Sequence, residues 1–105
     1  MNQILVVHKR PGFEAEVVRT DNTLEAFQGL LDGGTLCGIE LSETILGYAD
    51  DDGLSKELPL NFYLHGEPIV GPAFFSKIDD EGEDIGFETE AEALAVCRCL
   101  NDLRV

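Results

Sequence analysis

The sequence predicts an α+β fold, with a mainly antiparallel sheet of about four to six strands and two helices packed on it. Short apolar or alternating runs, separated by turn residues, recur from residue 4 to residue 78 and are typical of strands. Two amphipathic segments begin with helix-capping residues. The length of 105 residues fits a single domain over residues 1–105.

The first half of the chain predicts two pairs of strands. Residues 4–7 form a continuous apolar run, which is typical of a buried central strand. Residues 14–19 alternate loosely and can form a hairpin with this first strand across the turn at Pro11-Gly12. Residues 35–41 and 44–49 form the second expected pair of strands.

A first helix is expected between these two pairs. Asn22 is the predicted N-cap, and Glu25 lies where a capping box places its acidic residue. The pair Gly33-Gly34 ends the helix. The apolar side chains expected on the buried face are Leu24, Phe27, Leu30 and Leu31.

The second half is less regular until its last helix. Residues 58–65 are ambiguous, because Pro59 argues against a central strand, whereas residues 69–78 read as one strand despite Pro72. Thr89 and Glu92 repeat the capping-box pattern and predict a closing helix. The apolar face expected for this helix consists of Ala93, Val96, Cys97, Leu100 and Leu103.

Two helices do not cover both faces of a large sheet. The remaining sheet surface is therefore expected to be polar, or to be covered by loops or by a second subunit. A homodimer stays open as an alternative to a monomer at this point.

The charge of the chain is strongly unbalanced. Twenty-one Asp and Glu residues face seven Lys and Arg residues, which gives a formal net charge of −14. Such a surface repels nucleic-acid phosphates and anionic membranes, so direct binding to either is not expected. A basic protein partner fits this charge better.

The chain predicts a cytoplasmic protein. No apolar run approaches the roughly 20 residues of a membrane span, and the N-terminal run is too short for a signal peptide. The three cysteines, an odd number, argue against a secreted disulfide framework.

No catalytic, metal-binding or cofactor-binding constellation is predicted. Cys97 and Cys99 are two residues apart on a helix, so their thiols point about 200° apart and cannot hold one metal ion. The acidic segments do not fit the calcium-loop pattern of an EF-hand, whether Gly53 or Gly82 takes the place of the loop's glycine. His8 and His65 have no second ligand at helical spacing and are expected to be surface residues. We therefore expect a protein that is not an enzyme.

Two acidic runs are the candidate binding surface. Carboxylates in such runs can imitate the charges of nucleic-acid phosphates and occupy a basic cleft; alternatively they only keep the protein in solution. Both interpretations stay open at this stage. The candidate residues are Asp50, Asp51, Asp52, Asp79, Asp80, Glu81, Glu83 and Asp84.

Several short motifs follow one another in a recognisable order over roughly residues 4–75. They are Val6-Val7, Pro11-Gly12, Leu24-Glu25-Ala26-Phe27-Gln28, Gly33-Gly34, Ile39-Glu40, Asp52-Gly53, Leu58-Pro59, Asn61 and Ile69-Val70-Gly71. Their order and spacing resemble a known family, called domain of unknown function 3846. Pro72 and the cysteine-bearing last helix depart from the family pattern.

The resemblance implies a compact α+β domain without an assigned activity. Its members occur in bacteriophages, plasmids and related mobile elements, where anti-defence proteins are also found. The leading hypothesis is therefore a non-enzymatic, protein-binding accessory factor of a phage or mobile element. In its sharper form, this factor is a nucleic-acid mimic that acts against a defence or DNA-processing enzyme. A small enzyme with an unrecognised site, and a structural or dimerisation domain, are the alternatives.

Overall fold

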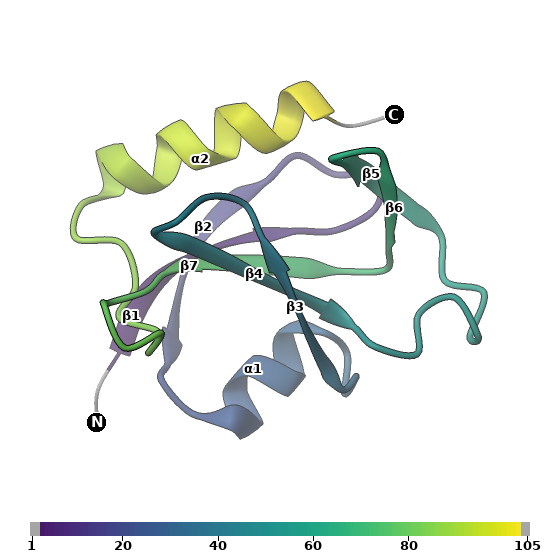
Figure 1. Ribbon diagram of the computed structural model, residues 1–105, viewed down its shortest axis with the longest axis horizontal. Helices are drawn as coiled ribbons and strands as arrows, with labels where there is room; N and C mark the ends of the chain where they lie inside the picture. Colours follow the sequence, from purple (N-terminus) through teal and green to yellow (C-terminus); the bar gives the residue numbers. More distant parts are fainter. Residues whose placement is uncertain (1–2, 104–105) are drawn as a thin grey trace.

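Nine helices and strands follow one another within residues 3–103, the part of the chain that the computed structural model describes. They are β1 (Gln3–Lys9), β2 (Glu16–Asp21), α1 (Leu24–Leu30), β3 (Leu36–Glu40), β4 (Ile45–Asp50), β5 (Leu60–Leu64), β6 (Glu67–Val70), β7 (Ala73–Lys77) and α2 (Glu90–Leu103). Five strands form an antiparallel sheet in the order β2-β1-β7-β4-β3, and β5 and β6 form a separate two-stranded sheet (Figure 1). The predicted α+β class is confirmed.

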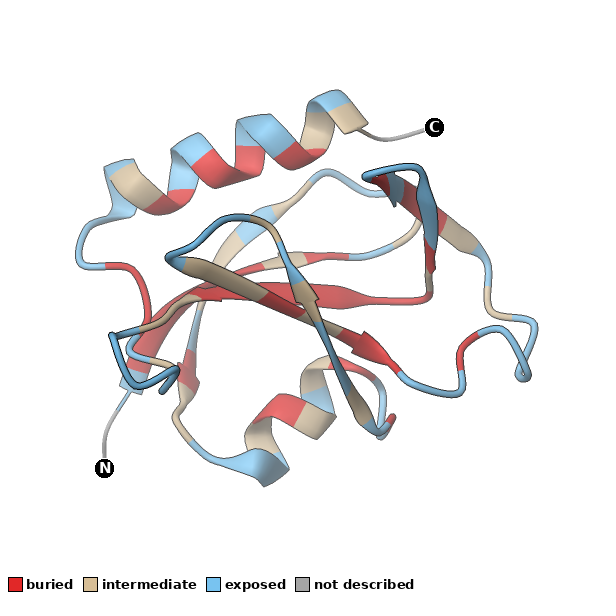
Figure 2. Ribbon diagram, in the orientation of Figure 1, coloured by how far each residue is buried: buried red, intermediate tan, exposed pale blue. Residues whose placement is uncertain are grey.

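The middle of the large sheet is made by strands from opposite ends of the chain. β7 lies between β1 and β4, and Phe75 pairs with Val7 on one side and Gly47 on the other. A Cβ at Gly47 would lie 2.3 Å from the ring of Phe75, so only glycine leaves room for that ring. The apolar residues of β1 and β7 are buried, as expected for central strands (Figure 2).

The two helices lie on opposite faces of the sheet (Figure 1). Phe27 and Leu31, from α1 and the residue that follows it, pack with Phe74 on one face. The opposite core contains residues of α2 together with Phe62 and Ile69 of the β5–β6 hairpin. The hairpin thus supplies cover that two helices alone do not provide, a contribution that was not among the expected ones of a polar surface, loops or a second subunit.

The segment 69–78, which was expected to be one strand, is two strands. Gly71 has a positive φ of 74°, and Pro72 follows it, so the chain turns there and leaves the hairpin for the large sheet. The backbone N–H of Gly71 donates to the carbonyl of Pro59 at 2.8 Å. Pro59 lies just before β5, so its lack of an N–H removes no hydrogen bond from the strand pairing.

The start of α1 also differs from its prediction. Thr23, and not Asn22, is the N-cap, because its hydroxyl accepts the backbone N–H of Ala26. The Asn22 amide instead donates to the carbonyl of Asp84 at 2.9 Å. Leu24 then occupies the first helical position, where it is 61% exposed and not part of the core.

Helix α2 follows its prediction closely. The Thr89 hydroxyl accepts the N–H of Glu92, and the Glu92 carboxylate accepts the N–H of Glu88, one residue before the expected position. The predicted apolar face is buried at Ala93, Val96, Cys97 and Leu100, and Leu103 is half-buried.

Candidate functional site

The two acidic runs lie at opposite ends of the large sheet. In the β4–β7 register, Ala49 pairs with Ala73 and Ile45 pairs with Lys77. Asp50 therefore ends β4 at one end of the pair, and Asp79 follows β7 at the other end. The predicted surface is two separate regions.

The first run is not the acidic patch that was predicted, because Asp50 is buried. The Lys56 ammonium donates to its carboxylate at 2.7 Å, and the backbone N–H of Asp52 donates to the same carboxylate at 2.9 Å. The hydrogen bond from Lys56 lowers the pKa of Asp50. A Cβ at Gly34 would lie 2.7 Å from this carboxylate, which explains a glycine there. Of this run, only Asp51 and Asp52 present exposed side chains.

The second run forms an ordered loop that displays its charges. One oxygen of Asp79 accepts the backbone N–H of Glu81 at 2.9 Å and that of Glu83 at 3.0 Å. The carbonyl of Asp79 accepts the N–H of Gly82, which has a positive φ of 82°. Asp79 thus organises the turn, and the side chains of Asp80, Glu81 and Glu83 are exposed.

Asp84 closes this loop and is only partly a surface residue. It forms a β-bridge with Ile78, and both its oxygens accept the Tyr48 hydroxyl, at 3.1 and 2.9 Å. Burial raises the pKa of Asp84 and also raises the pKa of Tyr48, whose hydrogen bond to Asp84 adds to the effect. Asp84 is therefore an anchor for the loop, and its carboxylate is not free for a partner.

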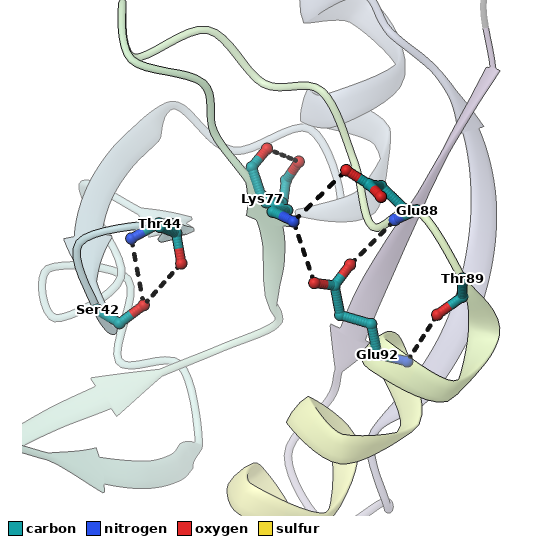
Figure 3. Close-up of polar contacts among 7 residues, drawn as sticks. Ser42, Thr44, Lys77, Glu88, Thr89 and Glu92 are labelled. Carbon is teal, nitrogen blue, oxygen red and sulfur yellow. Dashed lines mark hydrogen bonds and ion pairs between the residues drawn. The ribbon is translucent and has the colours of Figure 1, made fainter.

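Lys77 lies between the loop and the first turn of α2. Its ammonium donates to Glu92 at 3.1 Å and lies 3.7 Å from Glu88 (Figure 3). The hydrogen bond to Glu92 raises the pKa of Lys77. The hydrogen bond from the backbone N–H of Glu88 lowers the pKa of Glu92, and the hydrogen bond from Lys77 lowers it further. Lys77 is thus already paired with two carboxylates.

The hairpin between β3 and β4 joins the same end. The N–H of Ile78 donates to the carbonyl of Thr44 at 2.8 Å, and Figure 3 shows Ser42 and Thr44 on the other side of Lys77 from α2. We call this region the acidic end. Its exposed carboxylates are Glu43, Asp79, Asp80, Glu81, Glu83, Glu88 and Glu90.

Sequence reasoning missed Glu43 and the role of Lys77. Glu43 is far from residue 79 along the chain, and only the pairing of β4 with β7 brings the two together. An alternating pattern within each strand does not reveal which strand becomes its neighbour. Charge counting along the chain therefore found the loop but not the whole acidic end.

Comparison with known proteins identifies the family of the chain. A family model described as a domain of unknown function, DUF3846, matches residues 1–95. The chain belongs to the DUF3846 family. No significant match was found among curated proteins or among solved structures. The DUF3846 match includes both acidic runs and the first part of α2.

A buried polar network in this DUF3846 domain lies away from the acidic end. Lys9 is 1% exposed, and its ammonium donates to Asn61 and to the carbonyl of Arg10, both at 2.9 Å. The Asn61 amide donates to the carbonyls of Lys9 and Gly71, also at 2.9 Å. These bonds join β1, β5 and the turn before β7, so Asn61 and Gly71 have a structural role in holding these three segments together.

The acidic end can attract positive charge but does not form a ligand cage. Residues 3–103 contain no group of three or more metal-ligating side chains placed to hold an ion. An open cleft of about 290 Å³ lies beside the loop, lined by Arg19, Asn22, Asp84 and Glu88 among others. The Asp84 carboxylate and the Asn22 amide in it are already hydrogen-bonded. No helix among the described residues is long and apolar enough to cross a membrane.

Proposed function

We propose that this DUF3846 protein is a non-enzymatic binding protein of a phage or other mobile element, and that it engages a basic protein partner through its acidic end. The observation that carries the proposal is the concentration of exposed carboxylates there around Lys77, which is itself held by Glu88 and Glu92. Uncompensated charge at one end of a molecule steers an oppositely charged partner and orients its approach.

The construction of the loop supports this role. The Asp79 carboxylate holds the backbone of the loop, and the Asp84 carboxylate accepts the Tyr48 hydroxyl, so Asp80, Glu81 and Glu83 project from a fixed frame. A preorganised loop loses less conformational entropy when a partner binds it. In the sharper form of the proposal, the partner's basic surface is the nucleic-acid cleft of a defence or DNA-processing enzyme, and the acidic end occupies this cleft in the cytoplasm.

The enzyme alternative has less support from the described residues. Cys97 is buried, and burial raises the pKa of its thiol, which disfavours the nucleophilic thiolate. One ring nitrogen of His8 lies 2.8 Å from the carbonyl of Leu30, so this histidine is engaged with the end of α1. His65 is exposed in the β5–β6 turn.

The test is affinity capture from host lysate with two variants of equal charge change. The acidic-end variant carries Asp80→Asn, Glu81→Gln and Glu83→Gln. The matched control carries Asp51→Asn, Asp52→Asn and Glu57→Gln, three exposed residues at the opposite end. We expect the acidic-end variant to lose a basic partner that the wild type and the control retain, with weaker capture at higher salt.

Other outcomes separate the alternatives. Equal losses in both variants would indicate that net charge alone matters, as a purely solubilising surface predicts. Unchanged capture by the acidic-end variant would refute the proposal. The molecular mass of the captured and free protein in solution, measured by light scattering, reports whether a homodimer forms instead.

A further inference from the structure

A groove with both apolar and charged lining residues runs between strand β2 and the first turns of α2. Its open volume is about 460 Å³. Ala15, Val17 and Leu5 belong to its apolar lining on the sheet side, and Leu94 belongs to its lining on the helix side. Leu94 is 46% exposed, although its neighbours Ala93 and Val96 are buried in the core. A large apolar side chain is thus left at the side of a groove without cover from the chain itself.

The groove lies along an open edge of the sheet. β2 is the end strand of the order β2-β1-β7-β4-β3, and within residues 3–103 it pairs with β1 alone. An edge strand has a row of backbone N–H and C=O groups that another strand can pair with. The groove and the strand edge together therefore offer both backbone partners and an apolar surface.

The charges around the groove indicate which strand would fit. Glu16 lies on the strand side of the groove and Glu90 on the helix side, with Arg19 as the cation among the lining residues. Glu90 also belongs to the acidic end, so the groove opens directly beside it. A second copy of this chain, with its own net charge of −14, is disfavoured there.

We propose that the β2 edge and this groove bind an extended, basic and apolar segment of the partner, which adds to the sheet as an antiparallel or parallel strand. Alternate side chains of such a strand point the same way, so its apolar residues would contact Val17 and Leu94, while the Lys or Arg residues that alternate with them reach Glu16, the neighbour of Val17 in β2. The inference rests on the proposed function, because it assigns the basic partner a binding mode and a site next to the acidic end.

The test uses a synthetic peptide of about seven residues with alternating Lys and Val, long enough to cover β2. Nuclear magnetic resonance of the full chain maps where the peptide binds. A matched peptide of the same sequence, N-methylated on every second amide, retains charge and apolar surface but cannot form the strand hydrogen bonds on that side. We expect the unmodified peptide to shift the amides of residues 16–21 and 90–94, and the methylated one to bind about tenfold more weakly.

A variant of the protein provides the second comparison. Leu94→Ser removes an exposed side chain, so the fold should persist, and we expect the affinity for the unmodified peptide to fall about tenfold. Ala95→Ser, at the next and also exposed position of α2, leaves the charge unchanged and lies outside the groove lining, so it is the matched control and should bind normally.

The results distinguish this inference from the proposed function. If the peptide shifts only residues 79–84, or if both peptides bind equally, the groove is not a strand-binding site, although the acidic end still attracts basic chains. If no binding occurs in the groove at low salt, the inference is wrong as well. Loss of partner capture by the acidic-end variant would support the proposed function whatever the peptide does.

Discussion

The two acidic runs, 50–52 and 79–84, look alike in sequence, but the first aspartate is buried in one and exposed in the other. In each, the first aspartate accepts the backbone N–H of the residue two positions later, Asp52 for Asp50 and Glu81 for Asp79, both at 2.9 Å. This local turn is what an aspartate with a turn-forming sequence after it favours. The local rule therefore explains the similarity of the two turns but not their different surroundings.

The two runs differ in whether a lysine pairs with their first aspartate. Asp50 is buried and meets Lys56 within its own loop, whereas Asp79 stays exposed in a loop without Lys or Arg. Lys77, the lysine before that loop, turns to Glu88 and Glu92. An acidic run thus becomes a structural clamp when the fold supplies a cation and a cover, and a charged surface when it supplies neither.

The largest expected effect that tests this comparison is on stability at Asp50. Asp50→Ala should lower the free energy of unfolding by about 1–3 kcal/mol, because the partly buried backbone N–H of Asp52 loses its acceptor and Lys56 loses the carboxylate that ties it to the end of β4. Urea denaturation measures the change. Asp51→Ala, the adjacent exposed residue, is the control and should stay within about 0.5 kcal/mol of the wild type. An equal effect of both changes would mean that Asp50 is not a clamp.

The pH dependence of stability should have opposite signs at Asp50 and Asp84. The folded pKa of Asp50 lies below its ordinary value of 3.8, so its contribution is complete above that value and is lost as the pH falls through the folded pKa. The folded pKa of Asp84 lies above 3.8, so stability from this group falls as the pH rises from 3.8 through the folded pKa.

Single amide variants separate these two contributions. Unfolding free energies measured across acidic and neutral pH should show less acid destabilisation for Asp50→Asn than for the wild type. Asp84→Asn should instead remove a loss of stability on the neutral side, and its Asn carbonyl can still accept the Tyr48 hydroxyl. If both variants change the pH profile in the same direction, the two environments are not as different as the structure indicates.

A smaller effect is expected at Asp79. Asp79→Ala removes an acceptor for two exposed backbone N–H groups, which water can replace, so the cost should be on the order of 1 kcal/mol or less. Hydrogen exchange at Glu81 and Glu83 should accelerate. The control Asp80→Ala leaves those bonds in place, and faster exchange in that variant as well would show that the loop is held by other contacts.

The smallest effect on stability should come from neutralising the exposed charges. The acidic-end variant with Asp80→Asn, Glu81→Gln and Glu83→Gln should unfold within about 0.5 kcal/mol of the wild type, because solvated carboxylates repel one another weakly. Added salt should stabilise the wild type more than the variant, since screening reduces that repulsion. A large loss of stability would mean that these side chains are structural, and the acidic end would then not be a free binding surface.

Much of the fold was predictable because it depends on near neighbours in the chain. Thr89, Glu92 and the apolar spacing of α2 are local signals, and they gave both the start of the helix and its buried face. The strands β1 to β4 followed from short apolar runs between turn residues. The Asn22 prediction was wrong because Asn22 and Thr23 are both good caps, and the choice depended on Asp84, far along the chain.

The sequence by itself determined the net charge of this protein, its α+β class and its last helix, because charge, periodicity and capping can be read from the chain or from short segments of it. Only the tertiary structure decided which carboxylates are exposed. The carboxylates of Asp50 and Asp84 are engaged by Lys56 and Tyr48 and are not free on the surface. Glu43 becomes part of the acidic end because β4 pairs with β7. These outcomes require strand pairing and packing between distant segments, and no local pattern in the chain records which segments will meet.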